Sequence, residues 1–197
     1  MIKVGITGGI GSGKSVVASI FEMHDVPVYN ADKETKKLNN DSPHIREQLI
    51  HHFGKEVYDN NKQLDKKKFA EIIFSDNEKL ELANSIIHPE VLKHFNYWCV
   101  QNSDHKIVAL EAAILLEANF QVNIDKIVTV YSPLSQRISR VMARDGVSEA
   151  AVRTRMKYQI SEREKIRMAD YVIMNDHQSS LIDQVHNLIE DIMHRSI

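Results

Sequence analysis

The fold of this 197-residue chain is decided by its opening stretch, Ile2-Lys3-Val4-Gly5-Ile6-Thr7-Gly8-Gly9-Ile10-Gly11-Ser12-Gly13-Lys14-Ser15. The stretch reads as a short apolar strand, a glycine-rich turn and a helix that begins at about Gly13. Gly8, Gly13, Lys14 and Ser15 fit the phosphate-loop pattern G-x-x-x-x-G-K-[ST]. Glycines let successive backbone N–H groups turn inward around a phosphate, and the helix adds the positive end of its dipole. The stretch therefore predicts a binding site for a nucleoside triphosphate.

The loop and the first turn of the helix are expected to surround the phosphates. The residues concerned are Gly9, Ile10, Gly11, Ser12, Gly13, Lys14, Ser15 and Val16. Lys14 would supply a mobile cation to the β- and γ-phosphates, and the Ser15 hydroxyl would take one Mg²⁺ position. A glycine-rich turn without a ligand is the alternative, but a strand-like run precedes this loop and helical spacing follows it.

Composition indicates an ordinary globular protein, with 43% hydrophobic and 26% charged residues. The formal net charge of −2 gives no reason to expect a nucleic acid or a membrane surface as partner. The chain shows no leader segment and no apolar run long enough to span a bilayer, so we expect a cytoplasmic protein. Its single cysteine, Cys99, excludes an intrachain disulfide and is expected to be buried.

A second strand-like run, residues 26–29, follows the first helix and completes a strand–helix–strand unit. Such a unit implies a parallel sheet, whose ligands bind beyond the carboxyl ends of the strands. Asp32 comes just after this strand. It could accept the proton of an attacking hydroxyl. It could equally be the N-cap of a helix over residues 33–38, and the residues alone leave both interpretations open.

Residues 42–100 lose strand-like alternation and show helical spacing, which looks like an inserted subdomain that binds the acceptor. Asp65 is a plausible N-cap within it. His88-Pro89 follows a helical run, and because proline suits the first turn of a new helix, a helix break is expected at residues 86–89. His88 could hydrogen-bond a substrate or be structural; the two are equally favoured.

A third strand, residues 106–111, is almost wholly apolar and closes with Glu111. A carboxylate at the end of a central strand is where nucleotide-binding proteins hold Mg²⁺, directly or through water. Residues 112–117 are expected to run over the mouth of the ligand crevice.

Two further strands are expected at residues 127–131 and 170–175, followed by an amphipathic C-terminal helix from Leu181 to Ile192. Asn175 ends the last strand on the ligand side, where an adenine contact is possible. The ten histidines show no paired metal-ligand spacing, so Mg²⁺ is the only metal expected.

Residues 136–167 are dense in cations. Three arginines at spacings of three and four share one helix face, and they are Arg137, Arg140 and Arg144. A mobile helical hairpin whose arginines close over phosphates fits a kinase that excludes water, which favours this role for Arg140 and Arg144. For Arg153 and Arg155 a charged surface helix is favoured.

The ordered set of motifs resembles the dephospho-coenzyme A kinase family, a group of nucleoside-monophosphate-kinase-like P-loop kinases, over nearly the full chain. The points of resemblance are the opening loop, Ala31-Asp32, His88-Pro89, Leu115-Leu116-Glu117, Arg137, Arg140, Arg144-Asp145-Gly146, Gln159, Ala169-Asp170 and Asn175. The loop is shared in outline by many kinases, whereas the full set at these spacings is far more specific.

The resemblance implies a three-layer α/β P-loop fold with a central parallel sheet, a helical acceptor-binding insert and a small helical lid. The single domain would comprise a core of residues 1–31, 104–134 and 168–197, the insert 32–103 and the lid 135–167. It implies transfer of the γ-phosphoryl group of ATP to the ribose 3′-hydroxyl of dephospho-coenzyme A, with Mg²⁺ as cofactor. The protein would be a monomer or a weak homo-oligomer.

The resemblance also assigns roles to residues. Asp32, Lys14 and Arg140 would be catalytic. ATP would be bound by the loop with Arg144 and Asn175, and Mg²⁺ by Ser15 and Glu111. The acceptor would contact Asp32, His88, Leu115 and Glu117.

The chain departs from the family pattern at Asn30, Ala113 and Glu111, where aspartate, proline and aspartate are usual. Another small-molecule kinase, acting on a nucleotide or nucleoside, is the nearest alternative. A GTPase is disfavoured because the Asp-x-x-Gly and Asn-Lys-x-Asp motifs are missing.

Overall fold

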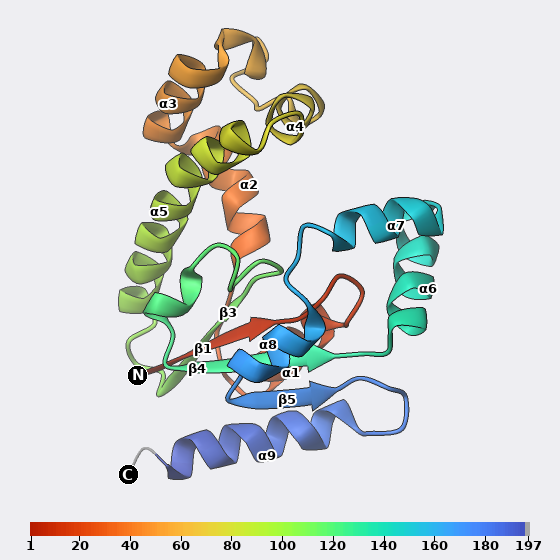
Figure 1. Ribbon diagram of the computed structural model, residues 1–197. Helices are drawn as coiled ribbons and strands as arrows, with labels where there is room; N and C mark the ends of the chain where they lie inside the picture. Colours follow the sequence, from red (N-terminus) through yellow and green to blue (C-terminus); the bar gives the residue numbers. More distant parts are fainter. Residues whose placement is uncertain (196–197) are drawn as a thin grey trace. The chain divides into compact units, whose positions relative to one another are not determined.

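Residues 1–195 are described by the computed structural model, in which they form two compact units. The first unit combines Met1–Asn30 with the chain from Gln101 onward, and the second is Ala31–Val100. The second unit is thus an insertion between two strands of the first, and both can be followed along the chain in Figure 1.

The first unit alternates strands and helices. Its elements are β1 (Ile2–Thr7), α1 (Lys14–Met23), β2 (Val28–Asn30), β3 (Ile107–Glu111), the 3₁₀ helix η2 (Phe120–Asn123), β4 (Lys126–Tyr131), α6 (Leu134–Asp145), α7 (Glu149–Met156), α8 (Glu162–Met168), β5 (Tyr171–Met174) and α9 (Leu181–His194). The expected strands and the C-terminal helix are confirmed to within two residues at each end.

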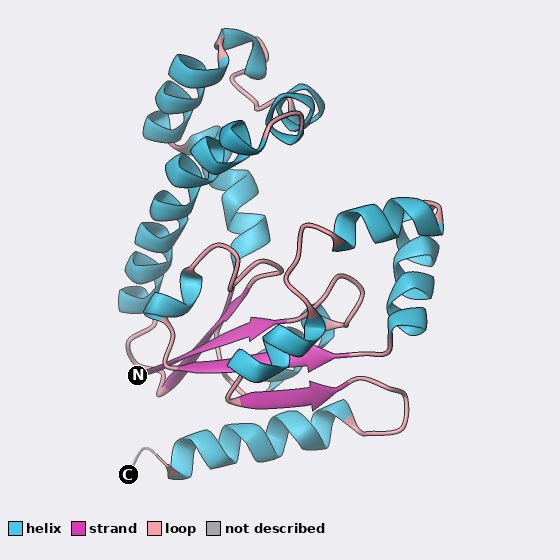
Figure 2. Ribbon diagram, in the orientation of Figure 1, coloured by secondary structure: helices cyan, strands magenta, loops and turns pink. Residues whose placement is uncertain are grey.

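The five strands form one parallel sheet in the order β2-β3-β1-β4-β5 (Figure 2). The strand β1 is central, with Ile6 opposite Glu111 of β3 and Val128 of β4. Because all strands run the same way, the loop after β1 and the ends of β2 and β3 lie at one edge. The expected α/β class with a central parallel sheet is confirmed.

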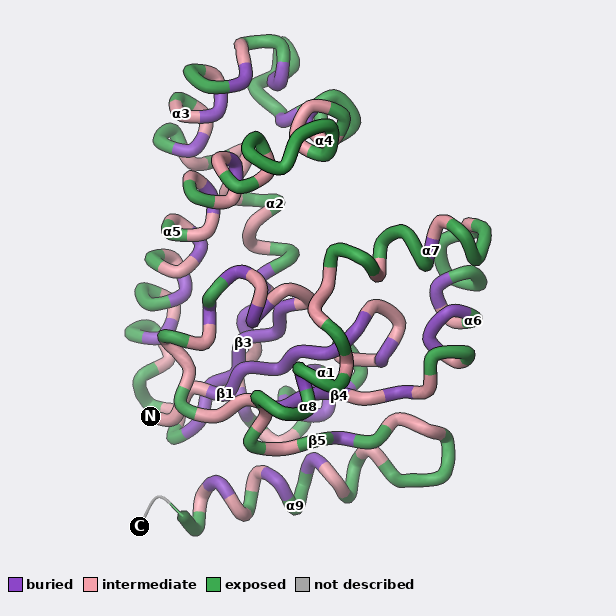
Figure 3. The backbone as a smooth tube through the Cα atoms, viewed as in Figure 1, coloured by how far each residue is buried: buried purple, intermediate pink, exposed green. Residues whose placement is uncertain are grey.

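Helices cover both faces of this sheet, which gives three layers. On one face α1 and α9 bury an apolar cluster that includes Val4, Ile6, Phe21 and Val185. On the other face α8 contacts β4. Figure 3 shows the result: β3 is buried along its whole length, whereas α9 alternates between buried and exposed residues, as an amphipathic surface helix should.

The second unit is helical. It consists of α2 (Ala31–Asp41), α3 (Pro43–Phe53), the 3₁₀ helix η1 (Lys55–Val57), α4 (Lys66–Phe74) and α5 (Asn77–Gln101), whose last residue begins the return to the first unit. The expected N-cap is confirmed, since the Asp65 carboxylate accepts hydrogen bonds from the backbone N–H groups of Lys67 and Lys68. Cys99 is buried, as expected.

The helix break expected at residues 86–89 is wrong, because α5 runs without interruption through Pro89. Proline removes one backbone N–H from the helix, which disfavours continuation but does not forbid it. The buried residues of α5 recur every fourth position on both sides of the proline, and they are Ala83, Ile87, Val91, Phe95 and Cys99. This continuous apolar stripe stabilises the uninterrupted helix that local sequence signals did not reveal.

None of the helices within residues 1–195 is long and apolar enough to cross a membrane.

Candidate functional site

The glycine-rich loop connects β1 directly to α1. Gly13 is the N-cap of α1 with φ 94°, and Gly11 has φ 80°, both in the left-handed region that favours glycine. A Cβ atom at Gly13 would collide with the side chain of Asn175, and one at Gly11 with the backbone of Arg137. The loop therefore presents backbone N–H groups at a helix N-terminus, which is a site suited to a phosphate.

Ser15, Glu111 and Asn30 meet at the edge of the sheet. Ser15 Oγ donates a hydrogen bond to Glu111 Oε1 at 2.8 Å, and Asn30 Nδ2 donates to Glu111 Oε2 at 2.5 Å. Glu111 is buried at the end of β3, opposite Asn30 of β2. The structure thus brings together both residues predicted to hold a metal. It also adds Asn30, which could have been found from its place at the end of the neighbouring strand.

The hydroxyl and carboxylate oxygens of this pair suit a hard cation such as Mg²⁺. Within residues 1–195, no group of three or more His, Cys, Asp or Glu side chains is arranged to hold a metal ion.

Arg140 reaches from α6 to the phosphate loop. Its guanidinium donates to Ser132 Oγ at 3.0 Å, to Gln136 Oε1 at 3.2 Å and to the Gly11 carbonyl at 3.4 Å. It also donates to both oxygens of Asn175 at 3.4 Å. These hydrogen bonds hold the guanidinium beside the loop, which is the position that its predicted catalytic role requires.

Asn175, which directly follows β5, connects the phosphate loop to the end of that strand by a hydrogen bond. Its Nδ2 donates to the Ser12 carbonyl at 2.8 Å, and its Oδ1 accepts from Arg140. Both ends of the amide are thus engaged within the protein, so in this conformation Asn175 positions the loop. The adenine contact that the sequence allows stays a prediction.

Arg144, the other arginine expected to contact ATP, points elsewhere. Its Nε donates to Asp145 Oδ1 at 2.7 Å, and Arg155 donates to the second oxygen at 2.6 Å. The two guanidinium groups hold the pKa of Asp145 at about 2. Arg144 and Arg155 therefore form a surface cluster where α6 and α7 meet.

Arg137, Gln159 and Glu162, to which the sequence analysis assigned no role in the site, contact the loop from its other side. Arg137 Nη1 lies 3.3 Å from Glu162 Oε1, and a Cβ atom at Gly9 would collide with both groups. Gln159 accepts from the Ile10 N–H at 2.8 Å and donates to the Ala113 carbonyl at 3.0 Å. Gln159 is 149 residues from Ile10 and 46 from Ala113. Arg137 and Glu162 lie on the separate helices α6 and α8, so helical spacing could not identify them as a pair.

Leu115 and Glu117, expected to bind the acceptor, are held inside the first unit. Leu115 is fully buried and packs against Gly5 of β1. Glu117 Oε1 lies 3.5 Å from Lys165 Nζ and accepts a hydrogen bond from the Ile160 N–H at 2.9 Å. In this conformation Leu115 is a core residue, and Glu117 anchors the start of α8. The path of residues 112–117 over the mouth of the crevice stays a prediction.

Lys165 is fully buried in α8, within the range predicted to be a mobile lid. Burial lowers the pKa of Lys165, and the carboxylates of Glu117 and Glu162 oppose that shift. The ammonium group of Lys165 loses its hydration on burial, and the carboxylates of Glu117 and Glu162 compensate for that loss. This interaction holds α8 against the core of the unit.

Replacing Glu117 by glutamine is expected to lower the free energy of unfolding by about 3 kcal/mol at pH 7, because it removes a compensating charge from a buried ammonium. The loss should shrink as the pH rises toward 10.5. Between the lowered pKa of Lys165 and its ordinary value, the unfolded chain binds more protons than the folded one, so stability rises with pH.

Urea unfolding of both proteins at pH 7 and pH 9.5 measures this difference. The double variant Glu117→Gln/Lys165→Met is the control, and it should recover most of the loss because both charges are gone. An unchanged midpoint for Glu117→Gln would show that the ion pair does not stabilise α8.

Asp32 and His88 both belong to the second unit. Asp32 is exposed in the first turn of α2, which begins one residue earlier at Ala31, so the N-cap alternative is wrong. A carboxylate in the first turn still interacts favourably with the helix dipole. His88 lies half-buried in α5, and burial lowers its pKa, which favours the neutral imidazole.

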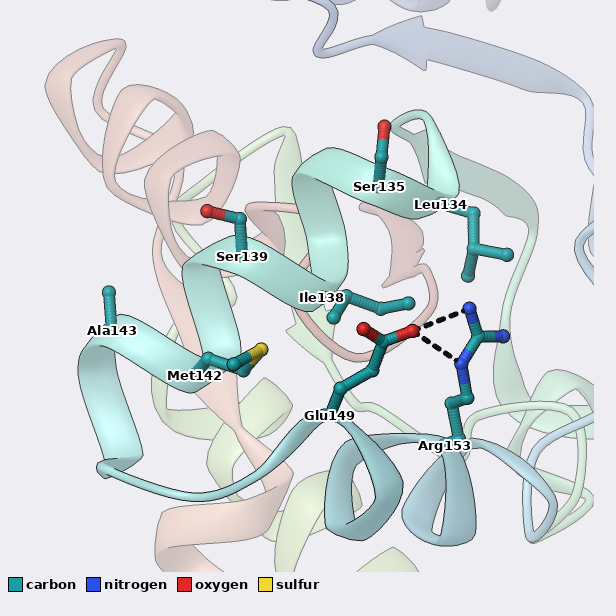
Figure 4. A pocket seen from close by; sticks show the side chains of 8 residues that line it. All are labelled: Leu134, Ser135, Ile138, Ser139, Met142, Ala143, Glu149 and Arg153. Atoms are coloured by element: carbon teal, nitrogen blue, oxygen red, sulfur yellow. Dashed lines mark hydrogen bonds and ion pairs between the residues drawn. The ribbon is translucent and has the colours of Figure 1, made fainter.

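A cavity of about 720 Å³ lies between α6 and α7 (Figure 4). Ile138 and Met142 contribute apolar groups, and Glu149 pairs with Arg153 at 2.7 Å beside them. Its lining residues include none of those predicted to bind ATP, the metal or the acceptor. Arg153 is here part of a surface ion pair, as favoured from the sequence.

Comparison with known proteins agrees with this geometry. The sequence profile of the dephospho-CoA kinase family matches residues 2–180. Dephospho-CoA kinase from Bacteroides fragilis (strain YCH46) is 42% identical over 188 residues, covering 95% of this chain and 91% of the relative. A crystal structure of a Thermus thermophilus protein matches with a TM-score of 0.82 at 29% identity, over 98% of this chain and 97% of the other. Shikimate kinase from Acinetobacter baumannii, with a TM-score of 0.55 at 15% identity over 100% and 96% of the two chains, shares the fold alone.

Proposed function

The chain belongs to the dephospho-CoA kinase family, and from this premise we propose how its residues carry out the reaction. Its activity is the ATP-dependent phosphorylation of dephospho-CoA in coenzyme A biosynthesis. We propose that the ribose 3′-hydroxyl of the acceptor attacks the γ-phosphorus in line, which releases ADP. Catalysis is then mostly positioning and neutralisation of charge.

The donor site consists of the loop from Gly9 to Val16. Its backbone N–H groups and Lys14 stabilise negative charge on the phosphates, and Arg140 adds a second cation. The observation that carries this assignment is the hydrogen bond between Ser15 and Glu111, which joins the phosphate loop to the carboxylate at the end of β3. Asn175 contributes by holding Ser12 in place.

Ser15 and Glu111 would hold Mg²⁺ together with the phosphates of ATP. When bound there, Mg²⁺ would neutralise charge on the transferring group and help to orient the phosphates. The usual family residue at position 111 is aspartate, and the longer glutamate reaches Ser15 directly here. Asn30 orients the second carboxylate oxygen, a role that the usual aspartate could not fill as a donor.

The acceptor side is assigned to the helical second unit. We propose that Asp32 orients the acceptor hydroxyl and accepts its proton, and that neutral His88 hydrogen-bonds the acceptor. Leu115 and Glu117 act indirectly, by packing under β1 and by holding α8. We propose that the insert expected at residues 32–103 is this second unit, Ala31–Val100.

A lid over the phosphates is proposed for α6 and α7. The remainder of the range 135–167 includes α8, whose Lys165 is buried against the core. Arg144, through Asp145 and Arg155, would stiffen the junction of the two lid helices and approach ATP only if those ion pairs open.

We further propose a cytoplasmic protein that works as a monomer or weak homo-oligomer, without nucleic acid or membrane as partner. The net charge of −2 supports the last point.

ADP release in the presence of Mg·ATP tests the proposed acceptor. Dephospho-CoA should support turnover, whereas AMP, CMP, adenosine and a reaction without acceptor should not. Turnover with a nucleotide or nucleoside in place of dephospho-CoA would favour the alternative of another small-molecule kinase.

A further inference from the structure

A second cavity, of about 210 Å³, lies within the second unit between α2 and α4. Buried Leu64 and Phe69, with half-buried Ile73, give it apolar walls. Exposed Lys36 and Lys66 also line it. The cavity, which we call the α2–α4 pocket, therefore combines apolar surface with two cations that favour an anionic group.

One residue that lines the pocket has an unused hydrogen-bond acceptor. Asn39 lines it, and Asn39 Oδ1 is buried without a hydrogen-bond partner within residues 1–195. The neighbouring Asn40 differs, because its Oδ1 accepts from the Leu64 N–H at 2.9 Å and its Nδ2 donates to the Lys36 carbonyl at 3.2 Å. A buried acceptor left unpaired is costly, so Asn39 is suited to a ligand that brings an N–H donor.

Asp32, Lys36 and Asn39 share one face of α2. Lys36 and Asn39 are four and seven residues beyond Asp32, so the three side chains lie within about 60° of one another around the helix. Along the axis, Lys36 is about 6 Å and Asn39 about 10 Å from Asp32. The face thus presents a carboxylate, then a cation, then an amide oxygen beside an apolar pocket.

The groups of dephospho-CoA follow in the same order. The reacting ribose hydroxyl is followed by the diphosphate, and the pantetheine arm beyond it carries a gem-dimethyl group and two amide N–H donors. We propose that the α2–α4 pocket binds the pantetheine arm, with Lys36 on the diphosphate and Asn39 Oδ1 accepting an amide N–H. This proposal rests on the assignment of the acceptor hydroxyl to Asp32.

Replacing Lys36 by methionine should raise the KM for dephospho-CoA about tenfold, since a charged hydrogen bond to the ligand is lost. The kcat should stay within twofold, because Lys36 is not assigned to the reacting phosphate. Lys37→Met is the matched control: Lys37 is also exposed on α2, but it is rotated by about 100° and does not line the pocket. An unchanged KM in Lys36→Met, or an equal rise in Lys37→Met, would contradict the proposal.

Phosphopantetheine, which has the arm but no adenosine, tests the pocket separately. It should inhibit the wild-type enzyme competitively against dephospho-CoA and noncompetitively against ATP. Ala70→Leu fills the pocket from α4 and should weaken this inhibition at least fivefold. If that variant does not fold, the Ile73 methyl resonance of the wild type, which should shift on addition of phosphopantetheine, decides the question.

The outcomes separate the two proposals. A wild-type protein that does not phosphorylate dephospho-CoA would overturn the proposed function. Normal turnover of dephospho-CoA without inhibition by phosphopantetheine would overturn only the pocket.

Discussion

Replacing Lys14 by alanine is expected to lower kcat by about 10³-fold, the effect of removing one preorganised charge from a phosphoryl-transfer site. Lys14 is the first residue of α1. It follows Gly13, whose left-handed backbone conformation makes the turn from the loop into the helix. The backbone donors of the loop remain in the variant, so ATP should still bind, although more weakly. The measurement is kcat at saturating ATP and dephospho-CoA.

The control for Lys14→Ala is Lys106→Ala, which removes an exposed lysine from the same unit at the opposite end of a neighbouring strand. Lys106→Ala should retain wild-type kcat, and both variants should unfold within a few degrees of the wild type. If Lys14→Ala kept a kcat within threefold of the wild type, the loop would not be the site of phosphoryl transfer.

Replacing Asp32 by asparagine is expected to lower kcat by about 10²- to 10⁴-fold, the range for loss of a general base. Asparagine preserves shape and can still hydrogen-bond the acceptor hydroxyl, but it cannot take up the proton. The KM for dephospho-CoA should therefore change by less than about threefold, since an effect confined to kcat marks an interaction made only in the transition state.

Asp41→Asn is the matched control, because Asp41 is an exposed aspartate at the other end of α2. Loss of the Asp32 charge from the first helical turn should cost only about 0.3–1 kcal/mol of stability, which thermal unfolding can check. Near-native kcat in Asp32→Asn together with inactive Lys14→Ala would leave the donor site intact and refute the assignment of the base.

Much of the donor site could be predicted because its signals are local. The loop from Gly8 to Ser15 needs glycines, a lysine and a hydroxyl at fixed spacing, and the neighbouring strand and helix have their own periodicity. Glu111 could be placed by its position at the end of a buried strand. The resemblance of the whole motif set then identified the family.

Local signals failed where packing outweighed them. Pro89 predicted a break, yet the buried stripe from Ala83 to Cys99 carries α5 through it. Residues 135–167 looked like one charged, mobile segment, yet Lys165 within it is fully buried. Lys165 stands among exposed lysines and arginines in the sequence, and no pattern sets it apart from them. The sequence therefore gave no signal that Lys165 is buried whereas its neighbours are exposed.

The sequence by itself determined the phosphate loop, the parallel α/β sheet, the family and its reaction, because each depends on residue types at short spacing or on their order along the chain. Only the tertiary structure decided which charges meet. Lys165 pairs with Glu117, Arg137 with Glu162, and Arg140 joins Gly11 to Asn175. These partners are up to about 130 residues apart. They come together because crossover connections return the chain to one edge of the sheet, where burial makes each charge require a partner.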